Sequence, residues 1–247
     1  MSAIVAIGGG ELKDLETLPI DRAIVKLAGK KHPKALFIPT ASNDSVGYWE
    51  IFRGVYGKKL GCETDALFLI REKLSKKQMQ EKILSADIIY VGGGNTLRML
   101  RIWRKFGVDV LLEKAHRKGT ILSGLSAGAI AWFRYGSSDS RRFMKDGKQK
   151  ESLMRVSALG FLSCTVSPHH IREKKLRDPG IKEMMVRTPG VAVALDDNSA
   201  ILVRDERYEI LRSKPEAGAK KIFRKNGRIE VILIKDSGTL KELLEKG

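Results

Sequence analysis

The chain has 247 residues, of which 43% are hydrophobic and 30% charged, a composition typical of a soluble globular protein. No apolar run approaches the roughly 20 residues that span a bilayer, and the first residues lack the basic stretch of a signal peptide, so we expect a cytoplasmic protein without a membrane segment. The net charge is +17, but basic residues are scattered and only 6% of residues are aromatic, which argues against a base-stacking surface for nucleic acid.

The cysteine and histidine content does not indicate a metal centre. Cys62 and Cys164 lie far apart, each in or beside a predicted strand, where a reduced cysteine packs as a small hydrophobic side chain. The histidines are His32, His116, His169 and His170. Because no HExxH or similar ligand spacing occurs among them, we expect neither a metal nor another cofactor.

The first two-thirds of the chain alternates between short apolar runs and helix-length segments. The runs are apolar at nearly every position, which predicts buried strands, and the segments between them have the 3.6-residue spacing of helices. The expected strands are 3–10, 35–40, 64–70, 87–94 and 120–126, and the expected helices are 19–30, 45–60, 75–86, 95–118 and 127–133. Strands that alternate with helices favour right-handed crossovers and a parallel sheet covered on both faces.

The alternation breaks after residue 133. Residues 134–156 are polar and rich in Ser, Lys and Arg, and we interpret them as a mobile excursion or a loop that closes over a site. Later elements are expected at 162–170 (strand), 172–187 (helix), 190–197 (strand), 200–211 and 221–234 (hairpins, the second with an Asn-Gly turn) and 239–246 (helix). The expected fold class is α/β, a three-layer, mostly parallel sheet with helices on both faces and carboxyl-terminal β-hairpins, in a single domain spanning 1–247.

A G-x-S-x-G sequence, GLSAG at 124–128, lies at the junction of a predicted strand and a predicted helix. At such a junction this spacing is typical of a nucleophile elbow, a sharp turn that points the serine hydroxyl outward. The flanking glycines leave room for the neighbouring strand and helix, and the N–H after the serine points at a developing oxyanion. A tight turn of small residues would give the same pattern without chemistry, but the parallel-sheet context favours Ser126 as a nucleophile.

Two glycine triplets follow predicted strands. Residues 92–94 expose backbone N–H groups that could hold a phosphate or supply a second oxyanion donor. Neither GxGxxG nor GxxxxGK[ST] occurs, so a nucleotide site is not indicated. The other triplet, residues 8–10, is followed by Glu11 with no basic residue at the turn. We interpret it as a close passage of the chain past a neighbouring loop.

Candidate partners for the serine follow two later strands. His169 and His170 stand at a strand end, where parallel-sheet enzymes place their working groups, whereas the other two histidines lie in lysine-rich helix ends or turns. Asp196 and Asp197 follow the next strand, where an acid could orient an imidazole and stabilise its protonated form. The DDNS sequence also makes a good turn by itself, so the acids alone decide nothing.

Four segments together resemble the peptidase E family, the aspartyl dipeptidases and their cyanophycinase relatives. They are VGGGNT (91–96), GLSAGA (124–129), SPHH (167–170) and ALDDNSAIL (194–202), and the similarity extends from the first strand to about residue 203. The fold of that family resembles class I glutamine amidotransferases. Its triad runs serine, histidine, carboxylate along the chain, which is the order here, whereas an α/β-hydrolase places the acid before the histidine.

The resemblance implies a role for each matching residue. Ser126 would be the nucleophile, His169 the general base and then the general acid, and Asp197 the carboxylate that orients the histidine. Gly94 and Ala127 would supply the oxyanion N–H groups.

Two positions depart from the family pattern. Aspartate stands where the family usually has glutamate, so the contact of Asp197 with His169 could be direct, through water, or made by Asp196 instead. His170 stands where relatives often have an aromatic or aliphatic residue, so it could compete for the role of base. Neither departure removes a functional group that the mechanism needs.

The expected function is a serine hydrolase that cleaves short peptides, dipeptides foremost, through an acyl-enzyme on Ser126. Arg141 and Arg142 follow the elbow helix and could bind an acidic amino-terminal residue of the substrate. The alternative is a non-catalytic basic protein on the same fold that contacts nucleic acid or an acidic partner, supported by the charge alone. A glutamine-amidotransferase-like hydrolase would need cysteine at the elbow. We expect a small peptide as the binding partner, and a homodimer stays open.

Overall fold

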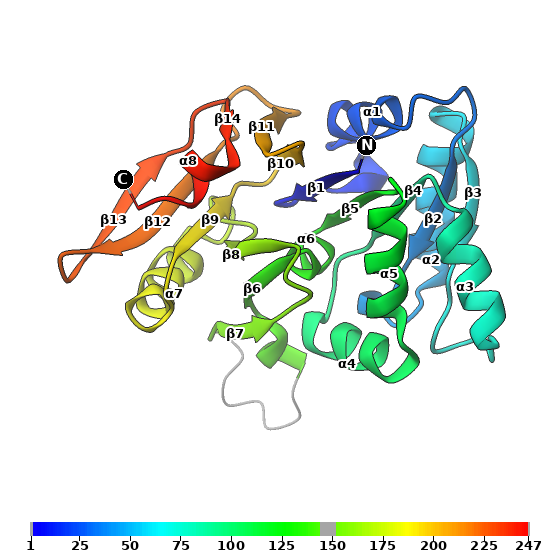
Figure 1. The fold of residues 1–247 in the computed structure, drawn as a ribbon, viewed down its shortest axis with the longest axis horizontal. Coiled ribbons are helices and arrows are strands. Elements are labelled where there is room, and N and C mark those ends of the chain that lie inside the picture. Colours follow the sequence, from blue (N-terminus) through cyan, green and yellow to red (C-terminus); the bar gives the residue numbers. More distant parts are fainter. Residues whose placement is uncertain (1, 144–151, 247) are drawn as a thin grey trace.

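The strands of the protein form two sheets (Figure 1), in a computed structural model that describes residues 2–143 and 152–246. The eight-stranded sheet has the order β14-β11-β10-β1-β5-β4-β2-β3, and the six-stranded sheet has the order β13-β12-β9-β8-β6-β7. The bounds in the first sheet are β1 Ala3–Ile7, β2 Lys34–Ile38, β3 Glu63–Ala66, β4 Ile88–Val91, β5 Ile121–Leu125, β10 Ser199–Arg204, β11 Arg207–Arg212 and β14 Ser237–Thr239. Those in the second are β6 Phe133–Ser138, β7 Met154–Ser157, β8 Leu162–Ser167, β9 Val191–Leu195, β12 Ala219–Lys225 and β13 Arg228–Leu233.

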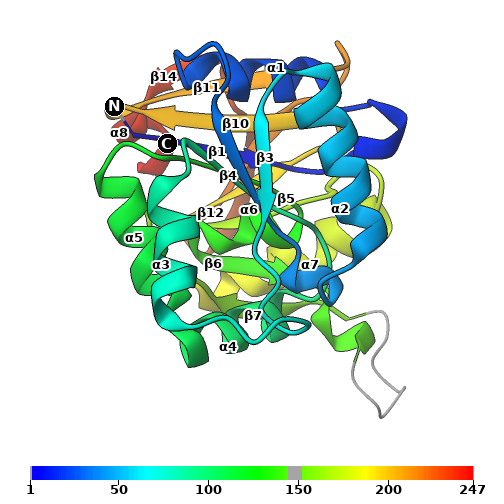
Figure 2. The same cartoon turned by 90° about the vertical axis from the view of Figure 1, so that its right-hand side faces the viewer.

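Helices cover the sheets in layers. Apolar residues of α1 and α2 pack on one face of the eight-stranded sheet, and α3, α4, α5 and α6 pack on its other face (Figure 2), in a core shared with the six-stranded sheet. Helix α7 covers the far face of the six-stranded sheet. The bounds are α1 Leu18–Leu27, α2 Val46–Phe52, α3 Lys76–Ser85, α4 Thr96–Phe106, α5 Val108–Arg117, α6 Ala127–Ala131, α7 Lys174–Arg187 and α8 Leu240–Leu244. Within the described ranges, no helix combines the length and the apolar character needed to cross a bilayer.

The expected α/β fold class is confirmed. Strands β1, β5, β4, β2 and β3 pair in parallel, as do β6, β8 and β9. The carboxyl-terminal hairpins β10–β11 and β12–β13 are antiparallel. Their turns, Asp205-Glu206 and Asn226-Gly227, have positive φ at both central residues, as type I′ turns require.

Two expected elements differ from the structure. The helix expected over 95–118 is two helices, because Gly107 adopts a left-handed φ of 72° and ends α4. The segment 134–156 was expected to contain no strand, yet β6 and β7 lie within it and pair with each other. Its polar composition concealed β6 because Gly136, Ser137 and Ser138 are buried without a large apolar side chain. Residues 144–151 of that segment lie outside the described residues.

The carboxyl ends of strands from both sheets meet at one place. The N–H of Ser126, after β5, donates to Ile7 at the end of β1, and the N–H of His169, after β8, donates to Gly8, which also follows β1. The N–H of Asn198, after β9, donates to Gly9. Residues that follow β1, β5, β8 and β9 therefore lie together, and these are the positions that the sequence singled out for chemistry.

Candidate active site

The turn between β5 and α6 has the geometry of a nucleophile elbow. Ser126 precedes α6 with φ 55° and ψ −106°, a conformation that a non-glycine residue rarely adopts. A Cβ atom at Gly124 would lie 2.6 Å from the Gly128 carbonyl carbon, and one at Gly128 would lie 2.1 Å from the Val91 oxygen. Both glycines are therefore needed for the turn to form, and the half-buried Ser126 side chain stays at the sheet edge.

The structure brings three side chains of the sequence analysis into one hydrogen-bonded row. The Nε2 atom of His169 lies 2.9 Å from Ser126 Oγ, and its Nδ1 atom lies 2.8 Å from Asp197 Oδ1. Ser126 follows a strand of the eight-stranded sheet, whereas His169 and Asp197 follow neighbouring parallel strands of the six-stranded sheet. The row thus forms where the two sheets meet.

The row fixes which way protons can move. An ionised Asp197 only accepts hydrogen bonds, so it holds the proton of neutral His169 on Nδ1. The lone pair of Nε2 then faces the Ser126 hydroxyl, which can donate to it. This arrangement can take a proton from the serine oxygen as that oxygen attacks an electrophile, and the carboxylate stabilises the imidazolium that forms.

The neighbouring His170 and Asp196 point elsewhere. His170 is 1% exposed, and its Nε2 lies 3.8 Å from Asp178 Oδ1. Burial, followed by the charge of Lys220, lowers the pKa of His170 to about 4, so it is neutral near pH 7. The Oδ2 atom of Asp196 accepts from the Gly218 N–H at 3.0 Å, and burial raises the pKa of this carboxyl group. The direct partner of His169 is therefore Asp197.

Glycines of the loop 92–94 lie against the elbow. A Cβ atom at Gly93 would be 3.5 Å from the Ser126 Cβ, and the Gly93 N–H donates to the Tyr48 hydroxyl at 3.5 Å. Gly94 has φ 136° and passes so close to the preceding loop that a Cβ atom would lie 2.4 Å from the Ala41 oxygen. Outside the regular helices and strands of residues 2–143 and 152–246, the Gly94 N–H has no backbone acceptor. Ala127 is the first residue of α6, a position where the N–H has no partner within the helix.

Comparison with known proteins shows the family of the chain. The sequence pattern of Peptidase family S51 matches residues 4–211. The chain belongs to this family. It is 31% identical over 225 residues to the uncharacterized peptidase YgaJ of Bacillus subtilis (strain 168), covering 90% of this chain and 93% of that one. This S51 member is therefore a serine-type peptidase, and the alternative of a non-catalytic basic binding protein finds no support.

Solved structures share the fold of this S51 peptidase. A peptidase from an acI-B1 Actinobacterium superposes with a TM-score of 0.68 at 17% identity, covering 97% of both chains. A candidate peptidase E protein from Listeria monocytogenes EGD-e superposes with a TM-score of 0.64 at 21% identity, covering 86% of this chain and 98% of that one. At such identities the likeness concerns the fold alone.

The arginines that the sequence suggested for substrate binding have other partners in the S51 peptidase. Arg142 pairs with Asp139 at 2.9 Å, and Arg141 donates to Ser152 Oγ at 3.1 Å. A different cation, Arg172, lies beside the row, with Nη1 4.0 Å from Asp197 Oδ1. Arg172 was not among the residues predicted from the sequence, although its place three residues after His169 in a basic segment was a usable signal.

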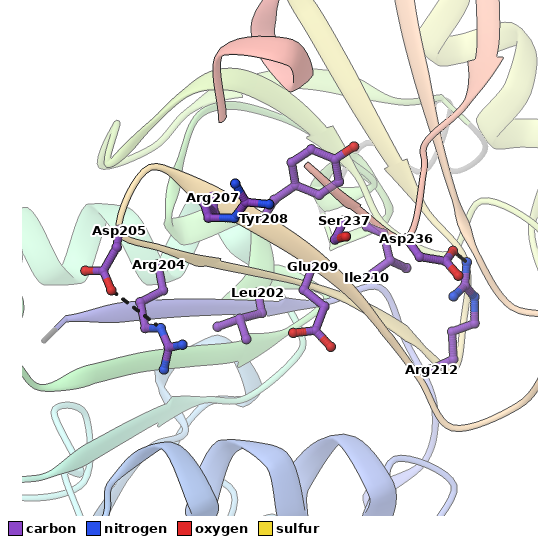
Figure 3. Close-up of a pocket in the computed structure, with 10 residues that line it drawn as sticks. All are labelled: Leu202, Arg204, Asp205, Arg207, Tyr208, Glu209, Ile210, Arg212, Asp236 and Ser237. Atoms are coloured by element: carbon purple, nitrogen blue, oxygen red, sulfur yellow. Dashed lines mark hydrogen bonds and ion pairs between the residues drawn. The ribbon is translucent and has the colours of Figure 1, made fainter. Parts of the chain in front are cut away.

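Of two surface hollows, one lies away from the row of Ser126, His169 and Asp197, and the other includes a residue of it. One of about 530 Å³ lies over β10, β11 and β14, and its charged side chains include the ion pairs Arg204–Asp205 and Arg212–Asp236 (Figure 3). Its lining includes no residue of the row. Another, of about 320 Å³, includes Asp197 in its lining, and its other charged side chains are Glu11, Glu16, Asp196, Glu216, Arg172 and Lys214. Among the described residues, no three His, Cys, Asp or Glu side chains cluster so that they could hold a metal ion.

Proposed function

We propose that this S51 peptidase hydrolyses dipeptides and other short peptides, with a preference for an acidic amino-terminal residue, through an acyl-enzyme on Ser126. The observation that carries the proposal is the hydrogen-bonded row of Ser126, His169 and Asp197, with contacts of 2.9 and 2.8 Å. A nucleophile, a base and an orienting acid in mutual contact are the groups that acyl transfer needs.

In the proposed mechanism, Ser126 Oγ attacks the peptide carbonyl carbon while His169 Nε2 accepts its proton. The Gly94 and Ala127 N–H groups donate to the oxyanion of the tetrahedral intermediate. His169 then gives its proton to the leaving amine, and the acyl-enzyme forms. Water, deprotonated by His169, hydrolyses the ester, and Ser126 regains its proton. Asp197 keeps the imidazole oriented throughout.

The acidic preference is supported by the overall charge of the chain and by one arginine beside the row. The whole chain carries a net charge of +17, which favours approach of anionic substrates. Arg172 is 59% exposed at its side chain, and its Nη1 lies 3.7 Å from Glu11 Oε1 and 4.0 Å from Asp197 Oδ1. Because a guanidinium group has five N–H donors, Arg172 can also bind a carboxylate that enters from solvent. Arg141 and Arg142 bind Ser152 and Asp139 instead of a residue of the row.

A fluorophosphonate probe tests the nucleophile. We expect wild-type protein to be labelled on Ser126 and the Ser126→Ala variant to be neither labelled nor active. The matched control is Ser163→Ala, which removes the hydroxyl of an exposed serine and should leave both unchanged. Labelling that persists in Ser126→Ala would show that the nucleophile lies elsewhere.

A dipeptide library with varied amino-terminal residues tests the substrate class. We expect cleavage of free dipeptides, fastest with an amino-terminal Asp or Glu. The Arg172→Gln variant should lose that preference through a higher KM for acidic substrates, with little change for neutral ones. Equal rates for acidic and neutral dipeptides in the wild type would refute the acidic preference while leaving the hydrolase intact.

A further inference from the structure

The first glycine triplet meets all three segments that carry the row. The carbonyl oxygen of Ile7 accepts from the Ser126 N–H, that of Gly8 from the His169 N–H, and that of Gly9 from the Asn198 N–H, each at 3.0 Å. We call residues 7–9 the strap. Three consecutive carbonyl groups of the strap thus hold the backbone at the nucleophile, at the histidine and directly after the carboxylate.

The residues that the strap holds share a strained backbone. Ser126, His169 and Asn198 have φ values of 55°, 56° and 64°, in the left-handed region that residues with a Cβ atom disfavour. Such conformations persist where the surrounding structure fixes them. A hydrogen bond from each of these residues to the strap is one such constraint.

The strap also joins the two sheets. It continues β1, which pairs with β5 and β10 in the eight-stranded sheet and points toward β8 and β9 in Figure 1. Its bond to Ser126 stays within that sheet, whereas its bond to His169 reaches the segment after β8 in the other sheet. The distance from Ser126 to His169 therefore depends on the strap.

Gly9 has a second, steric role. A Cβ atom at Gly9 would lie 2.0 Å from Asp197 Oδ1 and 2.4 Å from His169 Nδ1, the two atoms of the 2.8 Å contact. Gly9 is not among the glycines with positive φ, so its φ does not require glycine. Space beside the histidine–carboxylate contact, rather than conformation, is what requires glycine here.

We propose that the strap is the positioning element of the catalytic row and that Gly9 is a positioning residue, which allows His169 and Asp197 to touch. The proposal rests on the function proposed above. It predicts that a methyl group at position 9 acts by separating Nδ1 of His169 from Oδ1 of Asp197, leaving the substrate contacts of the site in place.

The test compares Gly9→Ala with Gly54→Ala. Position 54 is a fair control because an added Cβ atom there meets no atom within 4 Å in the described part of the chain, and its φ is not positive. We expect Gly9→Ala to lower kcat by about 10²-fold with little change in KM, since small misplacements of catalytic groups cost that much. Gly54→Ala should match the wild type.

A double-mutant cycle with Asp197→Ala separates positioning from general damage. If the added methyl group acts by displacing Asp197, combining Gly9→Ala with Asp197→Ala should cost little further activity. The low-field proton resonance of the His169 Nδ1–H should be lost in Gly9→Ala and kept in Gly54→Ala. Additive losses in the cycle, a resonance that survives in Gly9→Ala, or a wild-type kcat in that variant would each overturn the proposal.

Thermal unfolding decides the matter if Gly9→Ala is too unstable to assay. The loss of Tm caused by Gly9→Ala should then shrink when Asp197 is truncated to alanine, because one of the colliding atoms is gone; an undiminished loss would overturn the proposal.

Failure of the proposed peptidase function can be distinguished from failure of the strap proposal. It would appear as activity retained in Ser126→Ala, whereas failure of the strap alone would appear as an active Gly9→Ala beside inactive Ser126→Ala and Asp197→Ala.

Discussion

His169 Nε2 lies 2.9 Å from Ser126 Oγ, although the two residues follow strands of different sheets. No single strand or helix carries both groups, so their contact depends on how the sheets pack. The core between them is continuous, with Val91 of β4 and Val166 of β8 in one apolar cluster. Because a protein interior is close-packed, this core holds the two sheets at a set separation, and the hydrogen bonds from Ser126 and His169 to residues 7 and 8 act together with it.

Exchanging adjacent histidines for alanine should give opposite results. His169→Ala removes the group that contacts Ser126, and we expect kcat/KM to fall by at least about 10²-fold with Tm nearly unchanged. His170→Ala empties a buried site, so it should lower Tm while kcat stays within a few-fold of the wild type. Dipeptide hydrolysis and thermal unfolding of both variants measure this. The reverse ranking of activities would assign the base to His170.

Substitution of the two adjacent aspartates should likewise affect activity to different degrees. Asp197→Asn removes the charge that stabilises the His169 imidazolium and allows the wrong tautomer, so kcat should fall by roughly 10²- to 10⁴-fold. Asp196→Asn keeps an acceptor for the Gly218 N–H and should retain most activity. Single-turnover acylation rates report the chemical step directly. Equal losses in both variants would contradict the assignment of Asp197.

Gly94→Ala tests the proposed oxyanion donors. The new methyl group would collide with the Ala41 oxygen, and an alanine would be strained at the φ of 136° that residue 94 adopts. The Gly94 N–H should therefore move away from the elbow. We expect kcat to fall by about 10²-fold, which is the usual cost of one oxyanion donor.

Gly29→Ala is the control for backbone strain, since Gly29 also has a positive φ (62°) but meets no described atom within 4 Å of an added Cβ. It should lose stability by about 1 kcal/mol and keep its kcat. If both variants kept wild-type kcat, the Gly94 N–H would have no part in catalysis.

The order of elements was predictable because their burial is local in sequence. β4, for example, is Ile-Ile-Tyr-Val with every residue buried, a run typical of a strand covered on both faces. Strand β6 was not predictable, because its small residues are buried by neighbours that are distant in sequence. Likewise, an apolar run shows that a strand is covered but not which strand it pairs with, so the division into two sheets came only from the structure.

The site residues likewise fall into those that a local sequence pattern identifies and those that only the structure identifies. Ser126 stands in a local pattern whose glycines are required by the turn itself, so the sequence could single it out. The choice of Asp197 over Asp196 depends on side-chain direction after β9, which adjacent residues of the same type do not reveal. Gly9 was interpreted only as a close passage of the chain. The atoms that it approaches belong to His169 and Asp197, far along the chain, so no local pattern could identify them.

Asp21 should make the stability of the protein depend on pH. Its side chain is fully buried and accepts hydrogen bonds from Thr17 Oγ1 and the Tyr56 hydroxyl, each at 2.8 Å. Burial raises its pKa from 3.8 to about 6, despite these two bonds. Between the two values the folded state holds a proton that the unfolded state has released. The contribution of Asp21 to stability is therefore fully present below pH 4 and is lost as the pH rises through about 6.

The Asp21→Asn variant isolates this effect, because its amide does not titrate. The free energy of unfolding of the variant minus that of the wild type should increase by about 3 kcal/mol between pH 3 and pH 7, since a shift of one pKa unit corresponds to about 1.4 kcal/mol. Urea unfolding of both proteins at intervals across that range measures the difference, and the other carboxyl groups cancel because both proteins share them. A difference that stays constant with pH would show that Asp21 has an ordinary pKa in the folded protein, and that its two hydroxyl donors fully compensate its burial.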